Sequence, residues 1–159
     1  MFIANAIGNF STCLKDFPLG NKANNMEIVI AGYEIVLKVF TRESNRKNWA
    51  KTQNNLGIVY NNRIRGDRAE NLENAIATYH LALEVHTKKD LPTDWEKTQN
   101  NLGIVYNNRI RGDRAENLEN SIAAYHLALE VITKKDLPTD WATTQNNLGI
   151  VYFNRMGSG

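Results

Sequence analysis

The side chains of this chain that could do chemistry are three histidines, one cysteine, and lysines and asparagines that recur at fixed intervals. His80 and His126 occupy the same position in two neighbouring copies of a 46-residue repeat. Packed helices lie roughly 8–10 Å apart, whereas zinc needs imidazole nitrogens at about 2.0–2.1 Å. The two histidines are therefore too far apart to share a zinc ion, and we expect no metal site.

Two further candidates for catalysis align with apolar residues of the other copies. Cys13 stands where Val59 stands, so we expect a small buried side chain rather than a nucleophile. His86 stands where the next copy has Ile132, which favours packing over ligation. The sequence has no glycine-rich phosphate loop. We therefore predict neither enzyme activity nor a cofactor.

A recurring polar surface is the better candidate for function. At about 100° per residue, one helix face carries lysine, asparagine and isoleucine opposite the apolar face of Leu56 and Tyr60. Asparagine both donates and accepts hydrogen bonds, so it can pair with a peptide backbone of any sequence, and lysine favours a ligand carboxylate. The predicted partner-binding residues are Lys51, Asn54, Ile58, Asn61, Lys97, Asn100, Ile104, Asn107, Asn146 and Ile150.

Two other interpretations of this surface remain open. The asparagines can pair with each other between copies and set the spacing of the repeats. The isoleucines, such as Ile58, can be buried by neighbouring helices instead of meeting a ligand. The near identity of the copies can also reflect recent duplication, so a repeated surface is not by itself a ligand contact.

The repeat is the element that must position these residues. Trp49, Trp95 and Trp141 are spaced by 46 residues, and residues 49–94 and 95–140 differ at only four positions. A diverged copy fills residues 3–48, a half copy forms residues 141–156, and residues 157–159 read as a linker or tail. A fixed period of this length indicates a solenoid whose units bury their apolar faces by stacking. We therefore treat residues 1–156 as one array.

Each copy has the pattern of two helices joined by a turn. Leu56, Val59 and Tyr60 fall on one face of a first helix, and a second helix has a broader apolar stripe. No strand-like alternation is present. The predicted fold is all-α, with seven helices at 3–17, 23–42, 47–64, 69–89, 93–110, 115–135 and 139–156, of which the first copy forms an N-terminal cap.

The turn inside each copy contains Arg65-Gly66-Asp67, a tripeptide otherwise read as a cell-adhesion signal. Gly66 can adopt the left-handed conformation that ends a helix, and arginines suit the last helical turn. Asp67 followed three residues later by Glu70 has the form of a capping box. We therefore interpret the tripeptide as turn chemistry rather than as an adhesion site.

These residues resemble the tetratricopeptide repeat. The family pattern appears as Leu56-Gly57 and Tyr60 in the first helix, and as Ala75, Tyr79 and Ala82 in the second. The usual period is 34 residues; the additional residues here lengthen both helices and turns. The resemblance implies a right-handed superhelical solenoid whose concave face, made mainly by first helices, holds a peptide or protein. The long repeat is also similar to arrays beside bacterial CHAT-type, caspase-like peptidase domains.

Composition narrows the function classes. The net charge of +2 argues against a nucleic-acid binder, a single cysteine favours the cytoplasm, and no apolar run approaches the length of a membrane span. The leading hypothesis is a non-catalytic protein–protein interaction module. The alternative is a structural spacer or self-associating scaffold, a possible homo-oligomer, in which Phe153 replaces Asn61 and Asn107 as an aromatic contact.

Overall fold

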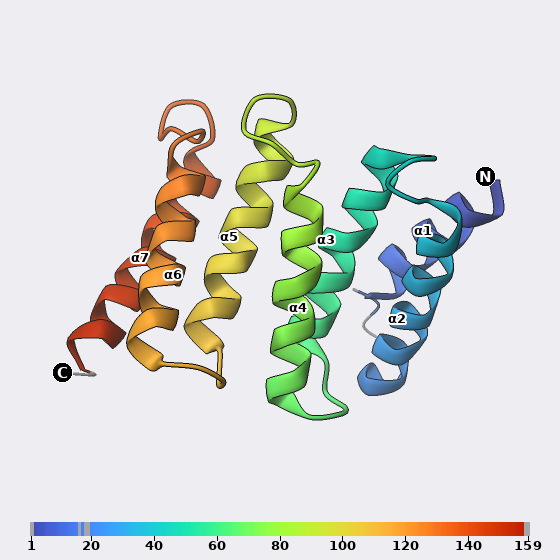
Figure 1. The fold of residues 1–159 in the computed structure, drawn as a ribbon, viewed down its shortest axis with the longest axis horizontal. Coiled ribbons are helices and arrows are strands. Elements are labelled where there is room, and N and C mark those ends of the chain that lie inside the picture. Colours follow the sequence, from blue (N-terminus) through green and yellow to red (C-terminus); the bar gives the residue numbers. More distant parts are fainter. Residues whose placement is uncertain (1, 16, 18–19, 158–159) are drawn as a thin grey trace. The chain divides into compact units, whose positions relative to one another are not determined.

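A computed structural model describes residues 2–15, 17 and 20–157 of the chain. Seven α-helices run through these residues, with no strand among them, which confirms the all-helical prediction for this part of the chain. Position 16 of the first predicted helix and residues 158–159 of the predicted tail lie outside the described residues. The helices are α1 Phe2–Lys15, α2 Lys22–Val39, α3 Arg46–Asn62, α4 Arg68–Leu83, α5 Pro92–Asn108, α6 Arg114–Leu129 and α7 Pro138–Met156 (Figure 1).

The chain divides into two compact units, Met1–Val85 and His86–Gly159. In the first unit α1 packs on α2, α2 on α3 and α3 on α4, and α1 also touches α3. In the second unit α5 packs on α6 and α6 on α7, and α5 also touches α7. We call α1, α3, α5 and α7 the first-type helices and α2, α4 and α6 the second-type helices, because they open and close successive copies of the repeat.

The core of the first unit joins a second-type helix to the first-type helix that follows it. Met26, Val29, Ile30 and Tyr33 of α2 pack with Leu56 and Val59 of α3, all 6% exposed or less. Further along, Trp49 packs against Val36 and Phe40. Trp49 therefore lies on the second helix of the preceding copy.

The second unit repeats this arrangement with its own residues. Leu118, Ile122 and Tyr125 of α6 pack with Leu148 and Val151 of α7. The tyrosines at this repeat position, Tyr33, Tyr79 and Tyr125, are at most 2% exposed. They are core residues of the repeat.

The Leu-Gly pairs of α3 and α5 allow a close approach of the second-type helix that follows each of them. A Cβ atom at Gly57 would lie 2.7 Å from Cε1 of Tyr79, closer than real Cβ atoms come to any neighbour. The same holds for Gly103, where Cε1 of Tyr125 would also be at 2.7 Å. Glycine is needed here because the tyrosine ring of the next helix occupies the space of a side chain.

The Arg-Gly-Asp segments form turns, as predicted, but the arginines do not lie in the last helical turn. Gly66 has a φ of +80°, which favours glycine, and Oδ1 of Asp67 accepts a hydrogen bond from the Glu70 amide at 2.7 Å. However, α3 already ends at Asn62, so no arginine lies in its last turn. Arg63 is the C-cap, and Arg65 and Gly66 belong to the loop that follows.

The second-type helices are shorter than predicted. Helix α4 ends at Leu83 instead of residue 89, and α6 at Leu129 instead of residue 135. After α4, the Glu84 amide turns back to the carbonyl groups of Leu81 and Ala82, which tightens the last turn and stops the helix. A short turn follows, in which Oγ1 of Thr87 accepts a hydrogen bond from the Asp90 amide at 3.0 Å.

Cys13 is exposed, so the prediction of a buried side chain is wrong. Its counterpart Val59 is 1% exposed because α2 packs against it. Among the described residues no helix packs on the equivalent side of α1. Phe10 shows the same effect, with 59% exposure against 4% for its counterpart Leu56. The outer face of the diverged first copy is therefore apolar.

Candidate functional site

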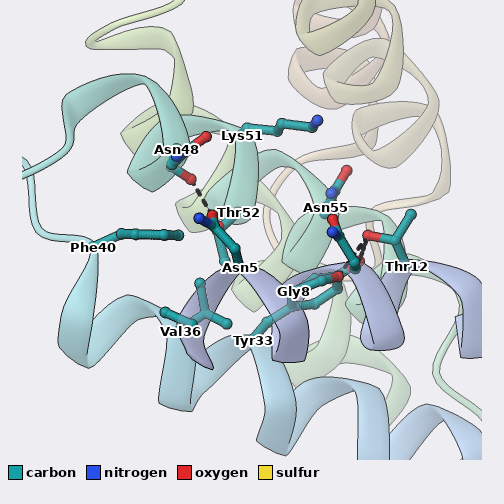
Figure 2. Close-up of a pocket in the computed structure, with 12 residues that line it drawn as sticks. Asn5, Gly8, Thr12, Tyr33, Val36, Phe40, Asn48, Lys51, Thr52 and Asn55 are labelled. Carbon is teal, nitrogen blue, oxygen red and sulfur yellow. Dashed lines mark hydrogen bonds between the residues drawn. The ribbon is translucent and has the colours of Figure 1, made fainter. Parts of the chain in front are cut away.

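The first unit has a hollow among α1, α2 and α3 (Figure 2). Helix α1 forms one wall and α3 the other, while Tyr33 and Val36 of α2 and the C-cap residue Phe40 form the base. The residues that line the walls are Ala4, Asn5, Gly8, Asn9 and Thr12 of α1 and Asn48, Lys51, Thr52 and Asn55 of α3. The hollow is thus apolar at its base and rich in amide groups at its walls.

The hollow exists because the first copy lacks an asparagine through which neighbouring first-type helices are hydrogen-bonded in the second unit. In the second unit, Oδ1 of Asn100 accepts hydrogen bonds from Nδ2 of Asn147 and Oγ1 of Thr144, both at 3.4 Å. The equivalent pair in the first unit is Gly8 of α1 and Asn55 of α3. Because Gly8 has no side chain, nothing fills the space opposite the Asn55 amide.

Hydrogen bonds organise the walls of the hollow. The Thr12 hydroxyl donates to the Gly8 carbonyl at 2.9 Å, so the Tyr33 hydroxyl donates to Thr12 at 3.0 Å. No hydrogen bond joins the side-chain amides of Asn5 or Asn55 to another protein group in the described part of the chain. These amides, like that of Asn9, can therefore serve a ligand.

The predicted binding residues of α3 lie in different surroundings. Lys51 is exposed and extends along the hollow (Figure 2). Asn54 is half-buried and has interactions within the protein. Ile58 lines a second recess together with Met26 and lysines of α1 and α2. Asn61 is half-buried, and its main-chain carbonyl oxygen accepts a hydrogen bond from the guanidinium of Arg68.

In the second unit, the predicted asparagines connect helices. Besides the Asn100 contacts, Oδ1 of Asn107 accepts a hydrogen bond from Nδ2 of Asn154 at 3.0 Å. Pairing between copies, which the sequence left open as an alternative, is therefore present between α5 and α7. Ile104 is partly buried against the α6–α7 core. The remaining predicted residues, Lys97, Asn146 and Ile150, are exposed.

Of the residues that line the hollow, only Lys51 is among the predicted binding residues. The amides of Asn5, Asn9 and Asn55 are not. The signal that could have found the hollow is the substitution of Gly8 at the position where the later copies have Asn54 and Asn100. Where one copy lacks a polar residue that the other copies share, the hydrogen bonds between neighbouring copies are lost, and the remaining polar groups face open space.

Comparison with known families agrees with this arrangement of helical hairpins. Residues 49–86 match the family model of the tetratricopeptide repeat. This segment comprises α3, α4 and the turn between them, and residues 95–140 repeat it with few changes. Tetratricopeptide repeats generally mediate protein–protein interactions and are typically non-catalytic. No curated protein matches the chain.

Two of the histidines have contacts within the protein. Nε2 of His126 lies 3.0 Å from the Tyr152 hydroxyl. His86 is 3% exposed, with Nδ1 3.0 Å from Oγ1 of Thr98. Because the Thr98 hydroxyl donates to the Asp94 carbonyl, His86 must donate through Nδ1. Burial lowers the pKa of His86, so the ring is neutral near pH 7.

Two further features bear on the class of protein. In the described portion of the chain, no group of three or more histidine, cysteine or acidic side chains could hold a metal ion. None of the described helices combines the length and apolarity needed to cross a membrane.

Proposed function

We propose that this chain is a non-catalytic protein–protein interaction module that binds a peptide or protein segment along its first-type helices. The observation that carries the proposal is the hollow at Gly8, where amide groups of α1 and α3 face open space. A ligand there would take over the hydrogen bonds that Asn100 and Asn147 exchange in the second unit.

The chemistry of the hollow favours an extended peptide. Asparagine amides offer donors and acceptors to main-chain groups without selecting a sequence. Lys51 adds a positive charge at the rim, which favours an acidic side chain or a terminal carboxylate. The apolar base, with Val36 and Phe40, offers a place for one ligand side chain.

The shape of the array, its protein context and its cellular compartment belong to the same proposal. We propose that the first-type helices form the concave face of a right-handed superhelix, which would add Lys97, Asn146 and Ile150 to the binding surface. We also propose, from the resemblance to arrays beside bacterial CHAT-type peptidase domains, that the chain is a long repeat variant of that kind. A single cysteine supports a reducing compartment such as the cytoplasm.

The test is a substitution that fills the hollow with a side chain of the protein itself. The variant Gly8→Asn restores the missing partner of Asn55, and a Cβ atom at Gly8 would meet only Cγ2 of Val36, at an ordinary 3.8 Å. Peptides selected on the native chain from a random display library should bind this variant at least about tenfold more weakly, a difference of about 1.4 kcal/mol. The variant Asn55→Ala should weaken the same peptides.

The matched control is Asn120→Ala, the same kind of change on α6 in the other unit. It should leave the affinity of the selected peptides unchanged. Circular dichroism and thermal unfolding of each variant check that the helices remain intact. Peptides that bind Gly8→Asn as tightly as the native chain would disprove the hollow as the binding site.

Self-association is a second candidate, favoured by one observation. Phe153 of α7 is 72% exposed at a position where α3 and α5 have asparagine. An exposed aromatic on a terminal helix is a common contact between copies. Static light scattering should then show a mass that rises with concentration and returns to the monomer in Phe153→Asn. A monomer at all concentrations would eliminate this candidate.

A further inference from the structure

Two hydrogen bonds in the second unit meet on one side-chain oxygen. Oδ1 of Asn100 in α5 accepts from Nδ2 of Asn147 and from Oγ1 of Thr144, both at 3.4 Å. Both donors belong to α7, the next first-type helix, so one carboxamide of α5 joins the two helices. Thr144 is 0% exposed in this arrangement. The second unit therefore shows which chemical group fits between two first-type helices at this position.

The first unit has both donors and lacks the acceptor. The counterparts of the two donors are Asn55 and Thr52 of α3, and the counterpart of Asn100 is Gly8 of α1. Helix α1 touches α3 as α5 touches α7. Because Gly8 has no side chain, the Thr52 hydroxyl donates instead to the Asn48 carbonyl of its own helix, at 2.7 Å. The Asn55 amide is left at the edge of the hollow (Figure 2).

A second position along the same helices shows that the gap is specific to Gly8. In the second unit, Nδ2 of Asn154 donates to Oδ1 of Asn107 at 3.0 Å. The counterparts in the first unit are Asn62 and Lys15, so α1 has a long side chain at that place. Of these two positions, Gly8 is therefore the one at which α1 offers no side chain to α3.

The walls around Gly8 match a neutral group that both donates and accepts hydrogen bonds. The amides of Asn5, Asn9 and Asn55 line this space, and each of them has donors and an acceptor. A carboxylate only accepts, and its charge is costly to remove from water between neutral walls, since Lys51 is exposed at the rim. An apolar side chain would leave the Asn55 amide without a partner. A carboxamide avoids both costs.

We propose that the hollow selects a carboxamide side chain, asparagine or glutamine, from the peptide or protein ligand. The ligand oxygen accepts a hydrogen bond from Nδ2 of Asn55, as Asn100 does from Asn147, and the Thr52 hydroxyl turns to the same oxygen. The ligand thus supplies the side chain that α1 lacks. The inference rests on the proposed function and deepens it, because it specifies one ligand residue in addition to main-chain pairing.

The first experiment attaches the carboxamide to the chain itself and needs no ligand. Gly8→Asn and Gly8→Asp have similar helix propensities and differ in the proposed contact. At pH 7, Gly8→Asn should unfold at a higher temperature than Gly8→Asp, and Asn55→Ala should abolish the difference. Ala123→Asn and Ala123→Asp, at an exposed position of α6, are the matched controls and should unfold at similar temperatures. A melting temperature of Gly8→Asp equal to or above that of Gly8→Asn would overturn the proposal.

The second experiment uses the peptides selected on the native chain from the display library. Each asparagine or glutamine of a peptide is replaced in turn by alanine and by the corresponding acid. At one position, both replacements should weaken binding to the native chain at least about tenfold and have little further effect on binding to Asn55→Ala.

The outcomes separate this inference from the proposed function. Peptides that lose affinity for Gly8→Asn but tolerate every replacement of an asparagine or glutamine would overturn the carboxamide and leave the proposed function standing. Peptides that bind Gly8→Asn as tightly as the native chain would overturn both.

Discussion

Arg63, the C-cap residue of α3, and Glu27 of α2 form a two-point ion pair. Nη2 of Arg63 lies 2.6 Å from Oε2 of Glu27, and Nε lies 2.9 Å from Oε1. Both side chains are only about a quarter exposed. The pair therefore connects the turn after α3 to the neighbouring second-type helix, in the unit that holds the hollow.

We expect Glu27→Gln to destabilise the chain by about 1–2 kcal/mol, because a bidentate ion pair becomes a single hydrogen bond from the charged guanidinium to a neutral amide oxygen. The hydrogen bond from Arg63 lowers the pKa of Glu27 below its ordinary value of 4.5. The stability that this carboxylate contributes is thus present above pH 4.5 and lost as the pH falls through the lowered pKa. Urea unfolding at neutral and acid pH measures both effects. Glu116→Gln, at an exposed site, is the control; an equal loss there would contradict the prediction.

The Leu-Gly positions of α5 and α7 should respond differently to the same change. Gly103→Ala places a Cβ atom 2.7 Å from the Tyr125 ring, and the resulting overpacking should cost about 1–3 kcal/mol. Gly149→Ala has open space and should gain up to about 1 kcal/mol from helix propensity. Thermal unfolding of the two variants measures this difference in sign. A destabilised Gly149→Ala would mean that the space beside Gly149 is not open.

Glu96 is a buried acid at a position where the preceding copy has Ala50. It is 2% exposed, and its Oε2 atom has no hydrogen-bond partner in the described part of the chain. Burial, and then the charge of Asp140, raise the pKa of Glu96 to about 7. The folded state therefore holds this proton more tightly than the unfolded chain, so the stability of the native protein should fall as the pH rises from about 4.5 to about 7.

We expect Glu96→Gln to remove this loss, because glutamine has the same shape without the charge. The variant should be more stable than the native chain at pH 8, by up to about 3 kcal/mol. The difference should vanish below about pH 4.5. Denaturant unfolding at several pH values measures it. A constant difference across the range would show that Glu96 does not titrate between these values.

His86 should change the stability of the protein with pH in the opposite direction to Glu96. Burial lowers its pKa below the ordinary 6.5, so its contribution to stability is present above pH 6.5 and lost as the pH falls through the lowered pKa. We expect His86→Ile, the residue of the next copy, to lose less stability than the native chain between pH 7.5 and 5.5. His126→Gln, on the exposed surface, is the control. The same acid sensitivity in His86→Ile would contradict the prediction.

Much of the fold follows from local patterns in the sequence. The 46-residue period, the apolar faces of the helices and the Gly66-Asp67 turn predict seven helices near their observed positions. These signals depend on residues within one helix or one turn. The ends of α4 and α6 were less predictable. The helical pattern of polar and apolar residues continues past Leu83 and Leu129, although the backbone leaves the helix there.

The candidate site depended on contacts that no local pattern contains. From the sequence, Asn100 and Gly8 are only an asparagine and its replacement in a diverged copy. The tertiary structure pairs Asn100 with Asn147 on the next first-type helix, and so shows why the same register is hollow at Gly8. Likewise, the sequence placed Cys13 in the core by analogy with Val59, but burial needs a helix on both sides.

By itself, the sequence determined that the chain is a helical repeat, which residues form its core, and where its hairpins bend, since these depend on periodicity and turn chemistry. Only the tertiary structure decided which asparagines satisfy each other and which amides face open space. These properties arise from pairs of residues far apart in the chain, and a repeated sequence gives such residues the same identity whether or not a partner lies opposite.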